Sequence, residues 1–161
     1  MKHIAVLSAA ITLIASEAVA LSCLAPDVAR SFERAAQAEE RYLIMLGTFE
    51  FGEVPSSDTG DINNPREVSV RSEFQGQYLT ENGFQAAPPL AVEIAFTCAA
   101  AWCGGMASDG AQVLAFVEQT NAGYTLNVGP CGGQAFREPN ATQIEQVLSC
   151  MSGDICEPLQ H

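Results

Sequence analysis

The sequence has 161 residues, which is long enough for one domain with a hydrophobic core. It carries 19 acidic and 7 basic residues, so its formal net charge at pH 7 is −12. This excess of carboxylates repels phosphate backbones and anionic membrane surfaces, which argues against nucleic-acid binding.

The N-terminal residues have the pattern of a secretory signal peptide. Lys2 precedes an apolar run from Ile4 to Ala15, which is too short to span a membrane, and Ala18-Val19-Ala20 is an A-x-A cleavage site. We predict a signal peptide over residues 1–20 and one mature domain over residues 21–161, periplasmic or secreted, with no membrane insertion after cleavage. A buried or anchoring helix is the alternative.

A helix and a long strand are predicted at the start of the mature domain. Ala25-Pro26-Asp27 suits a helix N-terminus, and apolar residues then recur at helical spacing to about Glu40. From Arg41 to Val54 a continuous apolar run gives way to alternation, which predicts a strand with a bulge or bend at Gly47. A polar loop, Pro55 to Pro65, follows.

Four more strands are predicted after this loop. Glu67 to Phe74 and Leu90 to Cys98 alternate between apolar and polar residues, as half-buried strands do. Val113 to Glu118 and Tyr124 to Val128 are joined by an Asn-Ala-Gly turn, which predicts a hairpin. This hairpin lies in the stretch from Trp102 to Gly132, which has a cysteine near each end.

A second helix near the C-terminus completes the pattern of a mainly β fold. Asn140 and Gln143 form a capping-box pattern before an apolar stripe, and Gly153 ends the helix. Asn140 also starts an N-glycosylation pattern, but a helix cap is the favoured interpretation. Five strands with helices only at the flanks predict a small antiparallel five-stranded barrel of the OB type, with one helix before it and one after, because closure hides the sheet edges.

The mature domain keeps all six cysteines, and an even number in an exported chain predicts three disulfides. A zinc site is disfavoured because the sequence has no C-x-x-C pair. Cys150 lies in the last turn of the second helix and Cys156 lies just beyond Gly153, where the chain reverses, so these two should pair. The remaining cysteines are Cys23, Cys98, Cys103 and Cys131.

For these four cysteines one pairing is preferred. Cys23 must tie the first helix to the barrel, and Cys131 at the end of the hairpin is its preferred partner. Cys98 would then pair with Cys103 and clip the turn that carries Trp102. The choice stays open, because six cysteines allow about fifteen sets of three bridges.

The inventory of side chains argues against an enzyme. The mature domain has no Lys and its only His is His161, so histidine general bases and His-activated nucleophiles lack their key member. Paired carboxylates remain, and a carboxylate-based hydrolase is a minor alternative. Asp58, Asp61 and Asn63 share a loop without EF-hand spacing, so a solvated loop is favoured over a calcium site. We expect no catalytic residue, cofactor or metal.

Three motifs are similar to those of one known family. They are Cys23-Leu24-Ala25-Pro26, Leu46-Gly47-Thr48-Phe49, and Cys103-Gly104 with the hairpin after it. They resemble the N-terminal Cys-x-Cys-x-Pro, the first barrel strand and the Cys-Gly hairpin of netrin-like domains, the OB-type modules of the tissue inhibitors of metalloproteinases. The resemblance implies protease inhibition, in which a free N-terminal Cys ligates the catalytic zinc. It also implies pairing of Cys23 with Cys103 and of Cys98 with Cys131.

The sequence departs from that family where inhibition would depend on it. Cleavage after Ala20 leaves Leu21-Ser22 ahead of Cys23, although cleavage two residues later would leave Cys23 first. Ala25 stands where the family has its second Cys. We therefore predict an exported, disulfide-stabilised, non-catalytic binding module with a protein partner, for which Trp102 and Cys23 are candidate contact residues. A netrin-like protease inhibitor is the alternative.

Overall fold

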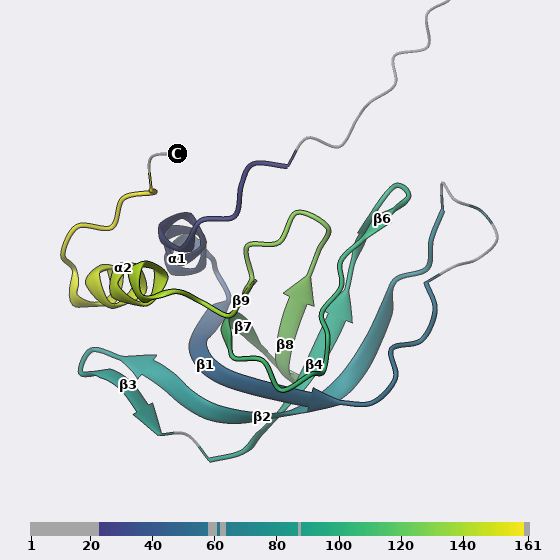
Figure 1. The fold of residues 1–161 in the computed structure, drawn as a ribbon, viewed down its shortest axis with the longest axis horizontal. Coiled ribbons are helices and arrows are strands. Elements are labelled where there is room, and N and C mark those ends of the chain that lie inside the picture. The colour runs from purple at the N-terminus through teal and green to yellow at the C-terminus, as the bar shows by residue number, and fades with distance from the viewer. Residues whose placement is uncertain (1–22, 58–60, 62–63, 87, 160–161) are drawn as a thin grey trace, which may run out of the picture.

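The computed structural model describes residues 23–57, 61, 64–86 and 88–159, and the predicted signal peptide lies outside these residues. In the described part of the chain, strands form a barrel and two helices lie next to each other against one side of it (Figure 1). This arrangement confirms the predicted mainly β fold with one helix before the barrel and one after.

The first helix, α1 (Val28–Gln37), begins where the sequence predicts. Asp27 is its N-cap, and the Asp27 carboxylate accepts a hydrogen bond of 3.1 Å from the Arg30 N–H. The predicted end at Glu40 is wrong, because Ala38 is already extended. The chain must straighten there, since the next strand begins at Arg41 in register with a neighbouring strand.

Five strands close into the barrel. Each pairs with two neighbours in the order β1–β2–β4–β8–β7, and β7 pairs back with β1. This closed ring confirms the predicted five-stranded OB-type barrel. The strands are β1 (Arg41–Phe51), β2 (Val68–Thr80), β4 (Leu90–Phe96), β7 (Val113–Thr120) and β8 (Gly123–Val128).

The barrel is mixed, so the expectation of a purely antiparallel barrel is wrong in one pair. β4 and β8 run parallel, with Glu93 opposite Thr125. The other four pairs are antiparallel. The reason is geometric, because a closed ring with an odd number of strands cannot alternate direction at every seam.

β1 belongs to both sides of the barrel, and Gly47 lies where it changes partner. Residues Arg41–Gly47 pair with β7, while Met45–Phe51 pair with β2. Gly47 lies directly opposite Gly76, and a Cβ on either glycine would overlap the facing backbone and come within 2.8 Å of the Phe74 ring. The two glycines therefore let β1 and β2 pair with the Phe74 ring packed against both backbones.

The structure moves the ends of several predicted strands. β1 stops at Phe51 rather than Val54, and β7 continues past Glu118 to Thr120. β2 continues past the predicted end at Phe74. Gly76 interrupts the apolar alternation of the sequence there, but the hydrogen-bonded ladder with β1 runs through it. β4 ends at Phe96 rather than Cys98. The Thr97 N–H still donates to the Val128 carbonyl at 3.0 Å, which completes the ladder with β8, and Cys98 then pairs with Cys103 in a separate two-stranded sheet. Four short strands were not predicted: β3 (Gly83–Ala86), β5 (Cys98–Ala99), β6 (Trp102–Cys103) and β9 (Ala135–Arg137).

The second helix, α2 (Ala141–Ser152), has both predicted ends. The Asn140 side chain accepts from the Gln143 N–H, the Gln143 side chain accepts from the Asn140 N–H, and Gly153 closes the helix with a left-handed φ of 78°. Below α1 and α2 lies a layer of apolar side chains that is distinct from the barrel interior. This layer includes Val28, Ile44, Leu114, Phe116, Phe136 and Val147.

The segment after α2 crosses back to the start of α1. The Leu159 N–H donates to the Asp27 carboxylate at 3.0 Å, and the Gln146 side chain donates to the Glu157 carbonyl at 2.8 Å. Burial acts to raise the pKa of Asp27, but the N–H donors of Leu159 and Arg30 outweigh it and hold that pKa below its ordinary value. The carboxylate thus joins both ends of the helical layer.

Three disulfides staple the fold, and they confirm the pairing preferred from the sequence. They join Cys23 to Cys131, Cys98 to Cys103, and Cys150 to Cys156. Cys23 with Cys103, the pairing implied by the family resemblance, does not occur. The three loops differ greatly, with sequence separations of 108, 5 and 6 residues.

Alanine at Gly47 or Gly76 should destabilise the barrel. The added methyl group has no space, so we expect the free energy of unfolding to fall by about 1–3 kcal/mol in each variant. Gly52→Ala is the matched control, because a Cβ at Gly52 meets no atom within 4 Å. Urea unfolding of the three variants measures the difference, and an equal loss in Gly52→Ala would contradict the explanation.

Removing the long-range disulfide should cost more stability than removing the terminal one. The chain-entropy relation makes loss of Cys23–Cys131 about 2.5 kcal/mol more costly than loss of Cys150–Cys156, because it releases a far longer loop. Melting temperatures of the two double Cys→Ser variants test this expectation. A lower melting temperature for the Cys150 and Cys156 variant would show that native contacts, and not loop length, decide the order.

Asp27→Asn should make stability less dependent on pH. Asn keeps an acceptor for Arg30 but cannot offer a second carboxylate oxygen to Leu159. The folded-state pKa is lowered, so the contribution of the carboxylate is complete above about pH 4 and is lost as pH falls through the folded value. We expect the variant to lose about 1–2 kcal/mol near neutral pH and almost nothing in strong acid. Urea unfolding near neutral pH and in strong acid measures the loss of stability. An equal loss at both pH values would contradict this expectation.

Candidate functional site

The hairpin of β5 and β6, which carries Trp102, contacts the end of β8. The Thr97 N–H donates to the Val128 carbonyl, and the Gly104 N–H donates to the Thr97 carbonyl at 2.9 Å. Gly104 lies so close to Val128 that a Cβ would overlap its carbonyl oxygen. The disulfide-closed hairpin of β5 and β6 is therefore locked onto the last residue of β8.

Both candidate contact residues predicted from the sequence belong to this region. Trp102 starts β6, and 65% of its surface is exposed. Cys23 is bonded to Cys131, which lies three residues beyond Val128 in the loop that leaves β8. We call this region the disulfide end, defined by residues 23–26, 98–106 and 129–133.

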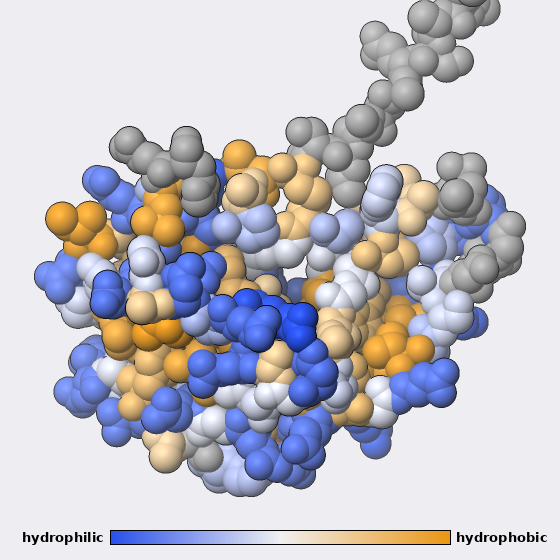
Figure 2. Space-filling model, in the orientation of Figure 1, coloured by the Kyte–Doolittle hydropathy of each residue, from blue (hydrophilic) through white to orange (hydrophobic). Residues whose placement is uncertain are grey.

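A cavity of about 370 Å³ lies at the disulfide end. Figure 2 shows the surface hollowed near the centre of this face, next to a band of hydrophilic side chains. Glycine contributes much of the wall, so backbone is exposed there rather than side chain. Its lining includes Gly104, Gly105, Met106, Asn127, Gly132 and Arg137.

The cavity exists because β7 and β8 separate. Their pairing runs from the turn only as far as Glu118 opposite Thr125. Two residues further along the ladder, Phe116 would face Asn127, but the Phe116 N–H donates instead to the Gln134 carbonyl at 2.8 Å. β9 then takes the next places along β7. The edge of β8 at Asn127 is left facing the cavity rather than a strand.

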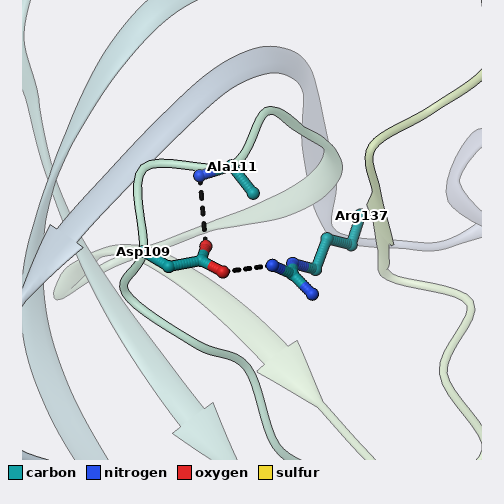
Figure 3. A network of polar contacts seen from close by, with 3 residues as sticks. All are labelled: Asp109, Ala111 and Arg137. Atoms are coloured by element: carbon teal, nitrogen blue, oxygen red, sulfur yellow. Dashed lines mark hydrogen bonds and ion pairs between the residues drawn. The ribbon is translucent and has the colours of Figure 1, made fainter.

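Arg137 is the only charged residue among those that line this cavity in the part of the chain described. It extends from β9 to Asp109, with which it forms an ion pair, and the other Asp109 oxygen accepts the Ala111 N–H at 3.1 Å (Figure 3). Both side chains are about half exposed, so the pair positions the guanidinium but adds little stability.

Sequence reasoning found the disulfide end but missed the residues that shape its cavity. Arg137 and Asn127 carry no motif, and β9, which places Arg137, has only three residues. The available signal was the density of glycine beside two cysteines, in Cys103-Gly104-Gly105 and Cys131-Gly132-Gly133.

The possible calcium loop gains no support. Asp58 and Asn63 lie outside the described residues, and Asp61 lies within them. Over residues 23–57, 61, 64–86 and 88–159, no three His, Cys, Asp or Glu side chains are placed to hold a metal ion. No helix in the same residues is both long enough and apolar enough to cross a membrane.

A scan of the chain against protein-family models finds no match, and searches of curated proteins and of solved structures also find none. The class of this protein is therefore assigned from its own fold and disulfides. It is an OB-type barrel with three disulfides, which place it in an oxidising, extracytoplasmic compartment.

Proposed function

We propose that this is a periplasmic or secreted, non-catalytic binding module that contacts a protein partner through its disulfide end. The observation that carries the proposal is the position of Trp102. Its large apolar side chain is mostly exposed at the tip of a hairpin that a disulfide and two backbone hydrogen bonds hold in place. A fixed, exposed Trp loses little conformational entropy on binding, and Trp is enriched at the energetic centres of interfaces.

A second apolar side chain belongs to the same region. Leu24 is 69% exposed, and the disulfide of Cys23 joins its segment to the loop beyond β8. The strongly acidic composition disfavours nucleic acid and anionic membranes as partners and favours a protein with an apolar or basic contact surface.

Two groups in the described residues have a displaced pKa, Asp27, which is buried, and Tyr42, which is half-buried. The pKa of Asp27 is lowered, and burial together with the nearby Glu118 carboxylate raises the pKa of Tyr42. Both pKa values therefore move away from neutral pH, where general acids and bases work best.

Metalloprotease inhibition is the second candidate function, favoured by one observation. The exposed segment Cys23–Pro26, which resembles the inhibitory N-terminus of netrin-like domains, belongs to the same end of the barrel as Trp102. Sequencing the mature N-terminus separates the two candidates. A chain that starts at Leu21 has no free Cys amine to ligate zinc, whereas a chain that starts at Cys23 does.

Trp102→Ala should weaken capture of the partner. The immobilised mature protein is incubated with the exported fraction of its own cells, and retained proteins are quantified by mass spectrometry. We expect at least about a tenfold loss of the specifically retained protein, as for an interface hot spot. Ile155→Ala is the matched control, because Ile155 is 77% exposed and lies beyond α2. Equal retention by both variants would contradict the proposal.

A further inference from the structure

Arg137 brings a positively charged side chain to the cavity at the disulfide end of an otherwise acidic protein. The chain carries a net charge of −12, yet among the described residues the one charged side chain that lines this cavity is Arg137. The Asp109 carboxylate engages one terminal nitrogen of its guanidinium. A guanidinium has five N–H donors in a planar fork, so donors remain for a second carboxylate.

Asn127 forms another part of the cavity wall, at the edge of β8. Where β7 leaves β8, Asn127 has no partner residue in the β7 ladder, because the Phe116 N–H donates to the Gln134 carbonyl, while the Asn127 side chain donates to the Glu118 carboxylate at 3.1 Å. An open strand edge recognises peptide main chain independently of side chains. Gly105 forms an open part of the cavity wall, since a Cβ there would meet no atom within 4 Å.

The size of the cavity limits how much peptide enters. Strand spacing, sheet spacing and rise per residue give about 160 Å³ for each residue of an extended chain. The cavity of about 370 Å³ therefore has the size of a short peptide segment, such as a chain end, rather than of a long strand.

We propose that this cavity binds the C-terminal carboxylate of an extended polypeptide, with Arg137 pairing to the carboxylate and the β8 edge at Asn127 pairing to the main chain. This inference rests on the proposed binding function and specifies the chemistry of the partner. Asp109 competes for Arg137, so it sets the affinity of the site.

The test uses randomised N-acetylated tripeptides and the full mature protein. One pool has free C-terminal carboxylates, a second is C-terminally amidated, and a third is amidated but carries Asp as its last residue. Amide chemical shifts of Gly105, Asn127 and Arg137 report binding in ¹⁵N-labelled protein. We expect the free-carboxylate pool to bind at least about tenfold more tightly than either amidated pool.

Four variants make the test specific. Gly105→Leu adds a bulky side chain to the cavity wall, where a Cβ meets no atom within 4 Å, and should abolish binding, while Gly52→Leu, at a position equally open but outside the cavity, should not. Arg137→Gln should lose the preference for acid over amide. Asp109→Asn keeps an acceptor for Ala111 but removes the competing charge, so it should tighten binding of free carboxylates by a few fold.

Three outcomes would overturn the inference. They are equal binding of the acid and amide pools, equal binding of the Asp-containing pool, and no shift of the three amides at millimolar peptide. If any of them occurs while Trp102→Ala still abolishes capture of the partner, the binding function stands and only the carboxylate site is wrong. If Trp102→Ala has no effect but the acid pool binds, the site stands and the proposed contact surface is wrong.

Discussion

The fold depends on one strand serving two sides of a closed barrel. β1 pairs with β7 along its first half and with β2 along its second, and the exchange occurs at Gly47. Gly47 faces Gly76 in the β1–β2 ladder, and the absence of both side chains leaves room for the Phe74 ring. Because β1 pairs with β7 along one edge and with β2 along the other, the five strands close into a ring without an open edge.

Closure of the barrel also determines the direction of β8 relative to β4. A ring of five strands needs one parallel pair, and β4 with β8 supplies it. β8 is then held firmly along β4, while its pairing with β7 stops at Thr125. β9 pairs with β7 beyond this point, and the loops that carry Gly104 and Pro130 line the cavity that remains. The same topology that closes the core therefore opens a cavity at the rim.

The two layers of the protein are joined by few but well-placed links. Asp27 caps α1 and also holds the segment after α2 through Leu159, while Cys23 anchors the chain before α1 to the loop beyond β8. The Cys23–Cys131 disulfide spans 108 residues and constrains the unfolded chain, whereas the Asp27 hydrogen bonds act only in the folded protein. The Cys23–Cys131 link holds the disulfide end in place, as a preorganised contact surface requires.

The sequence alone determined the features that depend on local pattern. Alternation predicts the strands, the Asn140 and Gln143 pair predicts the start of α2, and position along the chain was enough to prefer the observed cysteine pairing. Tertiary structure decided the rest: the parallel seam, the short strand β9, and the meeting of Arg137 with the edge of Asn127. The physical reason is that these features depend on which strands become neighbours when the barrel closes. Side-chain periodicity shows which face of a strand is buried, but it holds no information about which strand lies beside it.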